Sequence, residues 1–239
     1  MQHGELIYGL VVAVDIENFS RLDTLGQLLL QAQLNDVLDL AAHKALLDRD
    51  MWYRQLRGDG ELAVLPPDTD VAWVLADFTE RLIEALGQLR MTRQSEPRLR
   101  LRLAMHHGTL TAGLFGPVGS APIIACRLLD ARVARQALRA ESAGDLVLVI
   151  SQQLYHDVVE TRFHGLAPER FRPMRTSAQG MTYSGYLCAS TPRAATREAI
   201  RLTRVRRAPG LHLAAAGNAS KNVTRVHHDV AEATAARAP

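Results

Sequence analysis

The sequence predicts an α+β fold in which one β-sheet carries helices on one main face. Strand-like segments, either continuously apolar or alternating, recur between amphipathic segments with helical spacing. Their order is β-α-β-β-α-β, followed by a helix, a strand, a short helix and a hairpin. This order is the ferredoxin-like split βαβ arrangement, a βαββαβ palm with additional C-terminal elements.

Four segments make up the N-terminal half of this order. They are a strand over 6–16, a helix over about 24–47, a hairpin over 51–65 and a helix over 70–90. The first strand is a continuous β-branched apolar run, which is typical of a central strand. Ser20 and Asp23 are candidate caps for the first helix. The hairpin is predicted because two short strand patterns flank Gly58-Asp59-Gly60.

The C-terminal half begins with an alternating segment that predicts a half-buried strand. The expected elements are a strand over 99–107, a glycine-rich stretch over 108–119, a helix over 121–140, a strand over 145–150, a short helix over 151–160 and a closing hairpin over 170–188. Ser151 is the expected cap of the short helix. We therefore place one domain at 1–190 and a separate tail at 191–239.

Composition excludes several classes of protein. The 239 residues are 47% hydrophobic and 22% charged, values that allow a buried core. No apolar run reaches 18 residues and the N-terminus lacks a basic region, so we expect no membrane span, no signal peptide and a cytoplasmic location. Two cysteines predict neither a disulfide framework nor a cysteine zinc site.

Charge is divided unevenly along the chain. Residues 191–239 contain nine Lys/Arg and three Asp/Glu, a net +6, which leaves −3 for residues 1–190. The basic excess therefore belongs to the Arg- and Ala-rich tail, and we do not expect the main domain to bind nucleic acid.

Two carboxylates stand at positions that the predicted topology brings together. Asp15 ends the first strand and Asp59 lies in the hairpin turn. The strand and the hairpin are neighbours in a βαββ unit, so both side chains can face one cleft. Close carboxylates repel unless a cation lies between them, and hard oxygen ligands suit Mg²⁺ or Mn²⁺. Two such ions can support an in-line phosphoryl displacement.

Two further features fit phosphate chemistry. The loop that contains Asn18, Phe19 and Ser20 precedes a helix, so its backbone N–H groups can hold phosphate oxygens. Asn18 also tolerates a left-handed backbone. Arg127, on the predicted helix 121–140, can stabilise charge on a transferring phosphate. Each feature alone has an ordinary structural explanation, and the prediction depends on their order and spacing together.

Five motifs, in this order, resemble the catalytic domain of class III nucleotidyl cyclases, the adenylyl and guanylyl cyclase family. They are VDIENFSRL, RGDGELAVLP, LRLAMHHGTLTAGLFG, APIIACRLLDA and ISQQLYHDVV. The resemblance covers roughly residues 6–188. Within the family, the sequence is most similar in type to stand-alone actinobacterial members found beside signalling or defence effectors.

The resemblance implies a reaction and its site. A nucleoside triphosphate would bind with two Mg²⁺ or Mn²⁺ ions. It would be cyclised to a 3′,5′-cyclic nucleotide, a second messenger, with release of pyrophosphate. Asp15, Asp59 and the carbonyl of Ile16 would hold the metals, and Arg127 would stabilise the transition state. Because the family's site forms between two subunits, a homodimer is implied, and a separate cyclic-nucleotide effector protein is a possible partner.

The sequence also departs from the family pattern. Ile123 stands where the family has the Asn that orients the ribose, four residues before Arg127. Gln55 and Ser120 stand at the base-reading positions, which leaves base choice open. Arg175 takes the place of the late phosphate-binding Lys. The alternative is therefore a degenerate cyclase fold that senses nucleotides or binds proteins without turnover.

Overall fold

The protein is described by a computed structural model, which covers residues 5–93, 97–140 and 144–189. The predicted basic tail lies outside these residues. Eight strands form one sheet in the order β2-β3-β1-β4-β6-β8-β7, with β5 paired to β4. The strands are β1 (Ile7–Ile16), β2 (Tyr53–Arg57), β3 (Gly60–Val64), β4 (Leu101–Gly113), β5 (Gly116–Val118), β6 (Leu146–Ser151), β7 (Arg172–Ala178) and β8 (Met181–Ala189).

The α-helical segments are α1 (Thr24–Lys44), α2 (Val71–Trp73), α3 (Thr79–Thr92), α4 (Ser120–Leu129), α5 (Arg132–Arg139) and α6 (Gln152–Asp157). A π-helical turn over Val74–Phe78 joins α2 to α3. These elements confirm the predicted α+β palm. Asp23 is the cap of α1, since its side chain accepts a hydrogen bond from the Gly26 N–H at 2.8 Å. Ser151 caps α6 in the same way through Leu154.

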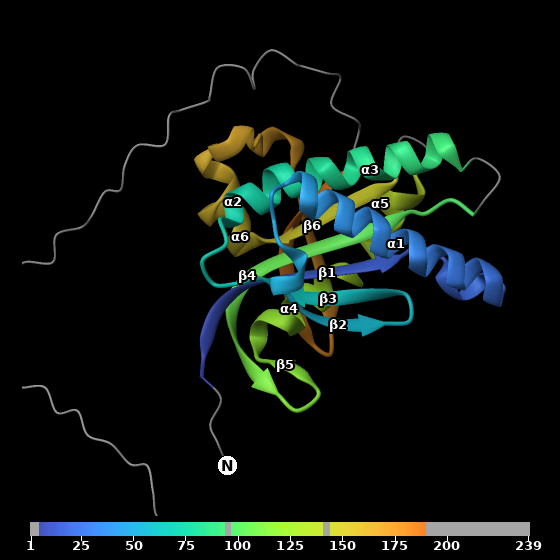
Figure 1. Ribbon diagram of the computed structural model, residues 1–239. Helices are drawn as coiled ribbons and strands as arrows, with labels where there is room; N and C mark the ends of the chain where they lie inside the picture. The colour runs from blue at the N-terminus through green and yellow to red at the C-terminus, as the bar shows by residue number, and fades with distance from the viewer. Residues whose placement is uncertain (1–4, 94–96, 141–143, 190–239) are drawn as a thin grey trace, which may run out of the picture. The chain divides into compact units, whose positions relative to one another are not determined.

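Helices cover both faces of the sheet, which differs from the expected single main face. Helices α1, α3 and α6 pack on one face, where α1 and α3 lie side by side (Figure 1). Helices α4 and α5 pack on the other. The reason lies in β1, whose residues from Gly9 to Ile16 are all buried. A strand that is apolar on both sides needs cover on both sides.

Two segments differ locally from the predicted elements. The helix expected over 121–140 is interrupted between α4 and α5, because Ala131 has extended ψ (φ −57°, ψ 132°). The glycine-rich stretch is largely a hairpin in which β4 continues to Gly113 and returns as β5. Consequently α4 starts directly after the β4–β5 hairpin and crosses the sheet above β1 and β4.

Candidate functional site

Asp15 lies on the face of the sheet that α4 covers. It is the penultimate residue of β1, and its Cα neighbours are Gly60 on β3 and Arg102 on β4. The side chain is largely buried and is bound by Arg102. The Arg102 Nε donates to one carboxylate oxygen at 2.8 Å, and a terminal guanidinium nitrogen donates to the other. This is a bidentate, charge-assisted ion pair, a strong form of this contact.

The Asp15 carboxyl is buried and is affected by two other acids. Burial raises the pKa of the Asp15 carboxyl, Arg102 lowers it, and the negative charges of Asp59 and Asp130 raise it further. The net shift of this pKa is upward. Three carboxylates therefore act on a region in which Arg102 supplies the direct counter-charge to Asp15.

The β2–β3 turn brings Asp59 to the end of β1. The backbone carbonyl of Asp59 accepts a hydrogen bond from the Ile16 N–H at 2.8 Å. Gly60 allows this approach, because a Cβ there would lie 1.9 Å from the Val14 carbonyl oxygen. The Asp59 side chain is exposed, and among the described residues its carboxylate has no hydrogen-bond or ion-pair partner. Asp15, Ile16 and Asp59 thus meet at one end of two adjacent strands.

The donor chemistry at this end of the sheet fits a hard divalent cation. Carboxylate and carbonyl oxygens are the ligands that Mg²⁺ and Mn²⁺ prefer. Within the part of the chain that the structure describes, no three acidic, His or Cys side chains form a complete metal cage. A Mg²⁺ ion that also binds substrate phosphates needs only one or two protein carboxylates. The Asp15–Arg102 contact would have to open for Asp15 to serve as one of them.

The predicted phosphate loop has a backbone suited to anions. Asn18 adopts a left-handed conformation (φ 57°, ψ 21°), as the sequence suggested, and a short 3₁₀ turn follows over Phe19–Arg21. The N–H groups of Asn18, Phe19 and Ser20 have no backbone acceptor among the described residues. The Phe19 ring packs against the core under α1, whereas Ser20 is exposed.

Arg175 lies far from Asp15 in the sheet. It is on β7, the edge strand, and β4, β6 and β8 separate that strand from β1. Four strand spacings amount to roughly 19 Å. Arg175 lines an open groove of about 420 Å³ together with Gln152 and Ser184. Arg127 lies on α4, and its neighbour Cys126 accepts a hydrogen bond from Arg57 on β2 at 3.4 Å. One chain therefore does not bring Arg175 to the two acids.

The two predicted base-reading residues are held by different contacts. The Gln55 side chain on β2 donates from Nε2 to the Phe115 carbonyl at 2.8 Å, at the tip of the β4–β5 hairpin. Ser120 opens α4, and its hydroxyl lies 3.5 Å from that of Thr109. Ile123, also on α4, is 51% exposed, so it is an apolar side chain on the helix surface and not a core residue.

Arg102 is the site residue that sequence reasoning missed. The signal was present in the alternation Leu99-Arg100-Leu101-Arg102, which places both arginines on one face of β4. Each arginine binds an acid at the end of β1: Arg100 contacts Glu17 at 2.9 Å and Arg102 contacts Asp15. Only the register of β1 against β4 shows which acid meets which arginine.

His106 is a buried residue of β4. Its Nδ1 lies 2.7 Å from the Ser151 hydroxyl oxygen. Burial, followed by the charge of His107, lowers the pKa of His106 to about 4. The imidazole is therefore neutral in the folded protein at neutral pH.

His106 should make the fold sensitive to acid. Its pKa in the fold is below the ordinary 6.5, so the unfolded chain takes up the proton first as pH falls from 6.5 to about 4. Stability present above pH 6.5 is lost through this window, by up to about 3 kcal/mol. Urea unfolding at pH 7 and pH 4 measures how much the free energy of unfolding falls between the two pH values. This fall should be smaller for His106→Gln than for the wild type, whereas exposed His43→Gln should match the wild type. An equal loss in all three proteins would contradict this assignment.

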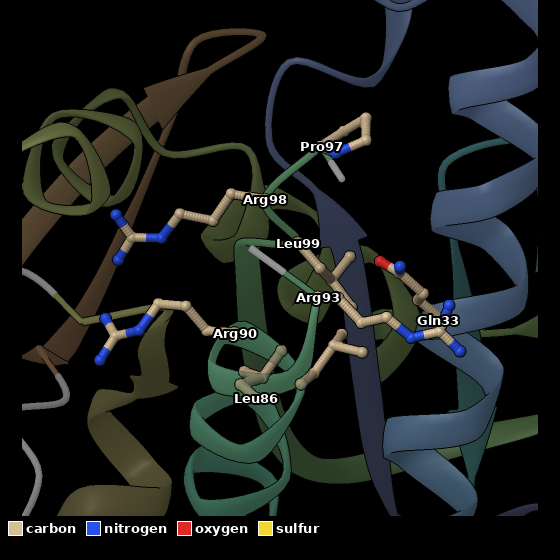
Figure 2. Close-up of a pocket in the computed structure, with 8 residues that line it drawn as sticks. Gln33, Leu86, Arg90, Arg93, Pro97, Arg98 and Leu99 are labelled. Atoms are coloured by element: carbon tan, nitrogen blue, oxygen red, sulfur yellow. The ribbon is translucent and has the colours of Figure 1, made fainter. Parts of the chain in front are cut away.

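A second cavity lies on the opposite face of the sheet, between α1 and the end of α3. It measures about 180 Å³ and is lined by Leu86, Leu99 and three arginines among others. Figure 2 shows Arg93 reaching toward Gln33, while Arg90 and Arg98 point the other way. Arg90 and Arg98 both form ion pairs with Asp145. The cavity shares no residue with the predicted site.

The protein shares its fold with solved catalytic domains of guanylyl and adenylyl cyclases, the class III nucleotidyl cyclase fold. Comparison with solved structures supports this fold. The guanylyl cyclase Cya2 matches with a TM-score of 0.54 at 13% identity, over 80% of this chain and 97% of that one. An adenylate/guanylate cyclase/hydrolase from Silicibacter pomeroyi matches with a TM-score of 0.54 at 18% identity, over 78% and 98%.

A third structure adds to this result. The catalytic core of a rhodopsin-guanylyl cyclase with converted specificity, in complex with ATPαS, matches with a TM-score of 0.53 at 19% identity, over 79% of this chain and 99% of that one. Identities this low show a shared fold. A scan of the sequence against protein-family models finds no match, and a search of curated proteins finds none either. In the described ranges, no helix has the length and apolar character to cross a membrane.

Proposed function

We propose that this protein cyclises a nucleoside triphosphate to a 3′,5′-cyclic mononucleotide and pyrophosphate, with two Mg²⁺ or Mn²⁺ ions, as a cytoplasmic second-messenger enzyme. The observation that carries the proposal is the convergence of Asp15 and Asp59 at the end of β1, on a fold shared with nucleotide cyclases. A separate cyclic-nucleotide effector protein would read the product, in defence or other signalling.

Asp15, Asp59 and the Ile16 carbonyl would hold the metal ions. When bound, such ions lower the pKa of the attacking hydroxyl and stabilise charge on the phosphate oxygens. The backbone N–H groups of Asn18, Phe19 and Ser20 are available to bind the triphosphate beside these acids. The exposed position of Asp59 lets a substrate reach this end of the sheet from solvent.

Arg102 has a role in the same proposal. It now neutralises Asp15, and a cation that took over the two Asp15 oxygens would leave the guanidinium with unsatisfied donors. A guanidinium beside a bound triphosphate then binds phosphate oxygens well, since its planar fork matches them. Arg102 would thus exchange a carboxylate for a phosphate when the substrate–metal complex binds.

A homodimer would complete the site. Arg175 is separated from the two acids within one chain, whereas a second copy can present its own α4 and β7, with Arg127 and Arg175, to them. A two-fold arrangement would form two equivalent sites, each with acids from one copy and arginines from the other. Gln55 and Ser120 would then contact the base.

The test is direct. Purified protein is incubated with each of the four nucleoside triphosphates and Mn²⁺ or Mg²⁺, and cyclic product and pyrophosphate are measured by chromatography. We expect equal amounts of both products from at least one triphosphate. Absence of product from all four, under both metals, would overturn the proposal.

The degenerate-fold alternative is favoured by one observation. Ile123 presents an apolar, half-exposed side chain on α4 where an enzyme of this fold uses an amide. Loss of one oriented donor costs about 2.7–4 kcal/mol of transition-state stabilisation. Triphosphate binding without any turnover would support a nucleotide-sensing module, and a lack of binding would support a protein-interaction module.

Replacing Arg102 should expose its role as counter-charge. In Arg102→Met the buried Asp15 carboxylate loses its partner, which should reduce the free energy of unfolding by about 3 kcal/mol or more. Mn²⁺ should restore much of this loss, because it binds the uncovered carboxylate only in the folded state. Thermal melting with and without Mn²⁺ measures both effects.

The matched control is Arg100→Met, which removes the nearer of the two arginine partners of Glu17, two residue pairs beyond Asp15 and Arg102. It should also lower the melting temperature, but Mn²⁺ should not restore it. Equal responses of the two variants to Mn²⁺ would contradict a metal role for Asp15.

A further inference from the structure

A polar side chain joins the β4–β5 hairpin to the edge strand β2. Gln55 on β2 donates from Nε2 to the Phe115 carbonyl, 60 residues away, at 2.8 Å. Gln55 is paired across the sheet with Leu62, and Leu62 with Ala13, so it lies on the face that carries Asp15 and α4. The contact is therefore on the side of the sheet where the proposed reaction takes place.

This contact fixes the orientation of the Gln55 amide. A carbonyl oxygen only accepts hydrogen bonds, so the NH₂ end of the amide must face the Phe115 carbonyl, which fixes the positions of Nε2 and Oε1. Gly116 lies against the same amide. Its φ is +128°, and a Cβ there would lie 2.7 Å from Oε1 and 3.0 Å from Nε2 of Gln55. Glycine is thus required for the amide to sit against the hairpin.

The orientation of an amide decides what it can read. A freely rotating Gln presents its donor and acceptor in either order and pairs with any base edge. Adenine and cytosine present an amino donor next to a ring acceptor, whereas guanine and uracil present a keto acceptor next to a ring N–H. A fixed amide matches the donor–acceptor order of one pair of bases. With the other pair, its donor faces a donor and its acceptor faces an acceptor.

We propose that Phe115 and Gly116 are positioning residues that lock Gln55 in one orientation, so that the β4–β5 hairpin sets the choice between amino bases and keto bases. The inference rests on the proposed function and deepens it. The side chains of Leu114 and Phe115 are 99% and 93% exposed, so the backbone of the tip, and not its apolar side chains, makes the contact within the chain.

The test compares Gly116→Ala with Gly165→Ala. Gly165 also has a positive φ, of +74°, but a Cβ there meets no atom within 4 Å, so its variant carries backbone strain without touching Gln55. Dissociation constants and kcat/KM are measured for ATP, CTP, GTP and UTP. We expect the wild type and Gly165→Ala to prefer one pair of bases by about 10-fold, and Gly116→Ala to lose that preference. The preference should be lost in KM more than in kcat.

A second pair of variants keeps the test decisive if Gly116→Ala does not fold. Gln55→Glu cannot donate to the Phe115 carbonyl and should also lose the preference. The matched control is Gln88→Glu, at an exposed position of α3 on the other face of the sheet, which should keep it. A wild type that binds all four triphosphates equally, or a Gly116→Ala or Gln55→Glu protein that keeps the wild-type preference, would overturn the inference and leave the proposed function standing. A wild type that binds no triphosphate would instead overturn the proposed function.

Discussion

Asp59→Asn should reduce the formation of cyclic nucleotide at least about 100-fold, a barrier increase of about 2.7 kcal/mol, without altering the fold. Asn keeps the size of the side chain but removes the negative charge that would bind the metal. Because the Asp59 side chain is exposed and its backbone carbonyl makes the bond to Ile16, the β2–β3 turn should be unaffected. Product formation by chromatography and the thermal melting curve measure the two effects.

The control is Asp36→Asn on α1, which removes one exposed acid away from the end of β1. It should leave both activity and melting temperature close to the wild-type values, since surface changes of this kind usually alter stability by less than about 0.5 kcal/mol. If Asp59→Asn retained activity similar to Asp36→Asn, the carboxylate pair would have no role in the reaction.

Two inactive variants should restore activity when they are mixed. Asp59→Asn damages the acid side of the proposed composite site, and Arg127→Ala damages the side supplied by α4. In a two-fold dimer that exchanges subunits, random mixing gives half mixed dimers, and each of these has one intact site of its two. The mixture should therefore reach about a quarter of wild-type activity, although each variant alone is nearly inactive.

The same experiment tests how the site is assembled. Co-expression of the two variants with different affinity tags, followed by tandem purification of the mixed dimer, should give about half of the wild-type activity. A mixed dimer as inactive as its parents would show that Asp59 and Arg127 act within one chain. Such a result would contradict the two-copy arrangement while leaving the fold assignment intact.

Local patterns in the sequence were sufficient to predict most of the fold. The apolar run of β1, the Gly58-Asp59-Gly60 turn and the caps Asp23 and Ser151 each depend on neighbours in the chain, and the structure confirms them as elements. The positions of α4 and α5 on the second face could have been inferred from β1, whose continuous hydrophobicity requires cover on both sides.

The contacts that sequence reasoning missed are made between distant segments. Arg102 meets Asp15 across 87 positions, and Gln55 meets Phe115 across 60. The register of β1 against β4 decides the first pairing, and a shift of one residue would turn either side chain to the other face. The second depends on where the β4–β5 turn lies relative to β2. Sequence patterns could therefore nominate Asp15 and Asp59 as a pair but could not show that one of them already has an arginine partner.

The Asp15–Arg102 pair implies that this protein can fold without a divalent ion, because the arginine supplies the counter-charge of the buried acid. The chain can therefore fold in a cell starved of magnesium or manganese. If the proposed reaction takes place, scarcity of either ion would then stop product formation while the folded protein remained intact. Output could resume as soon as the ion returned, with no new synthesis.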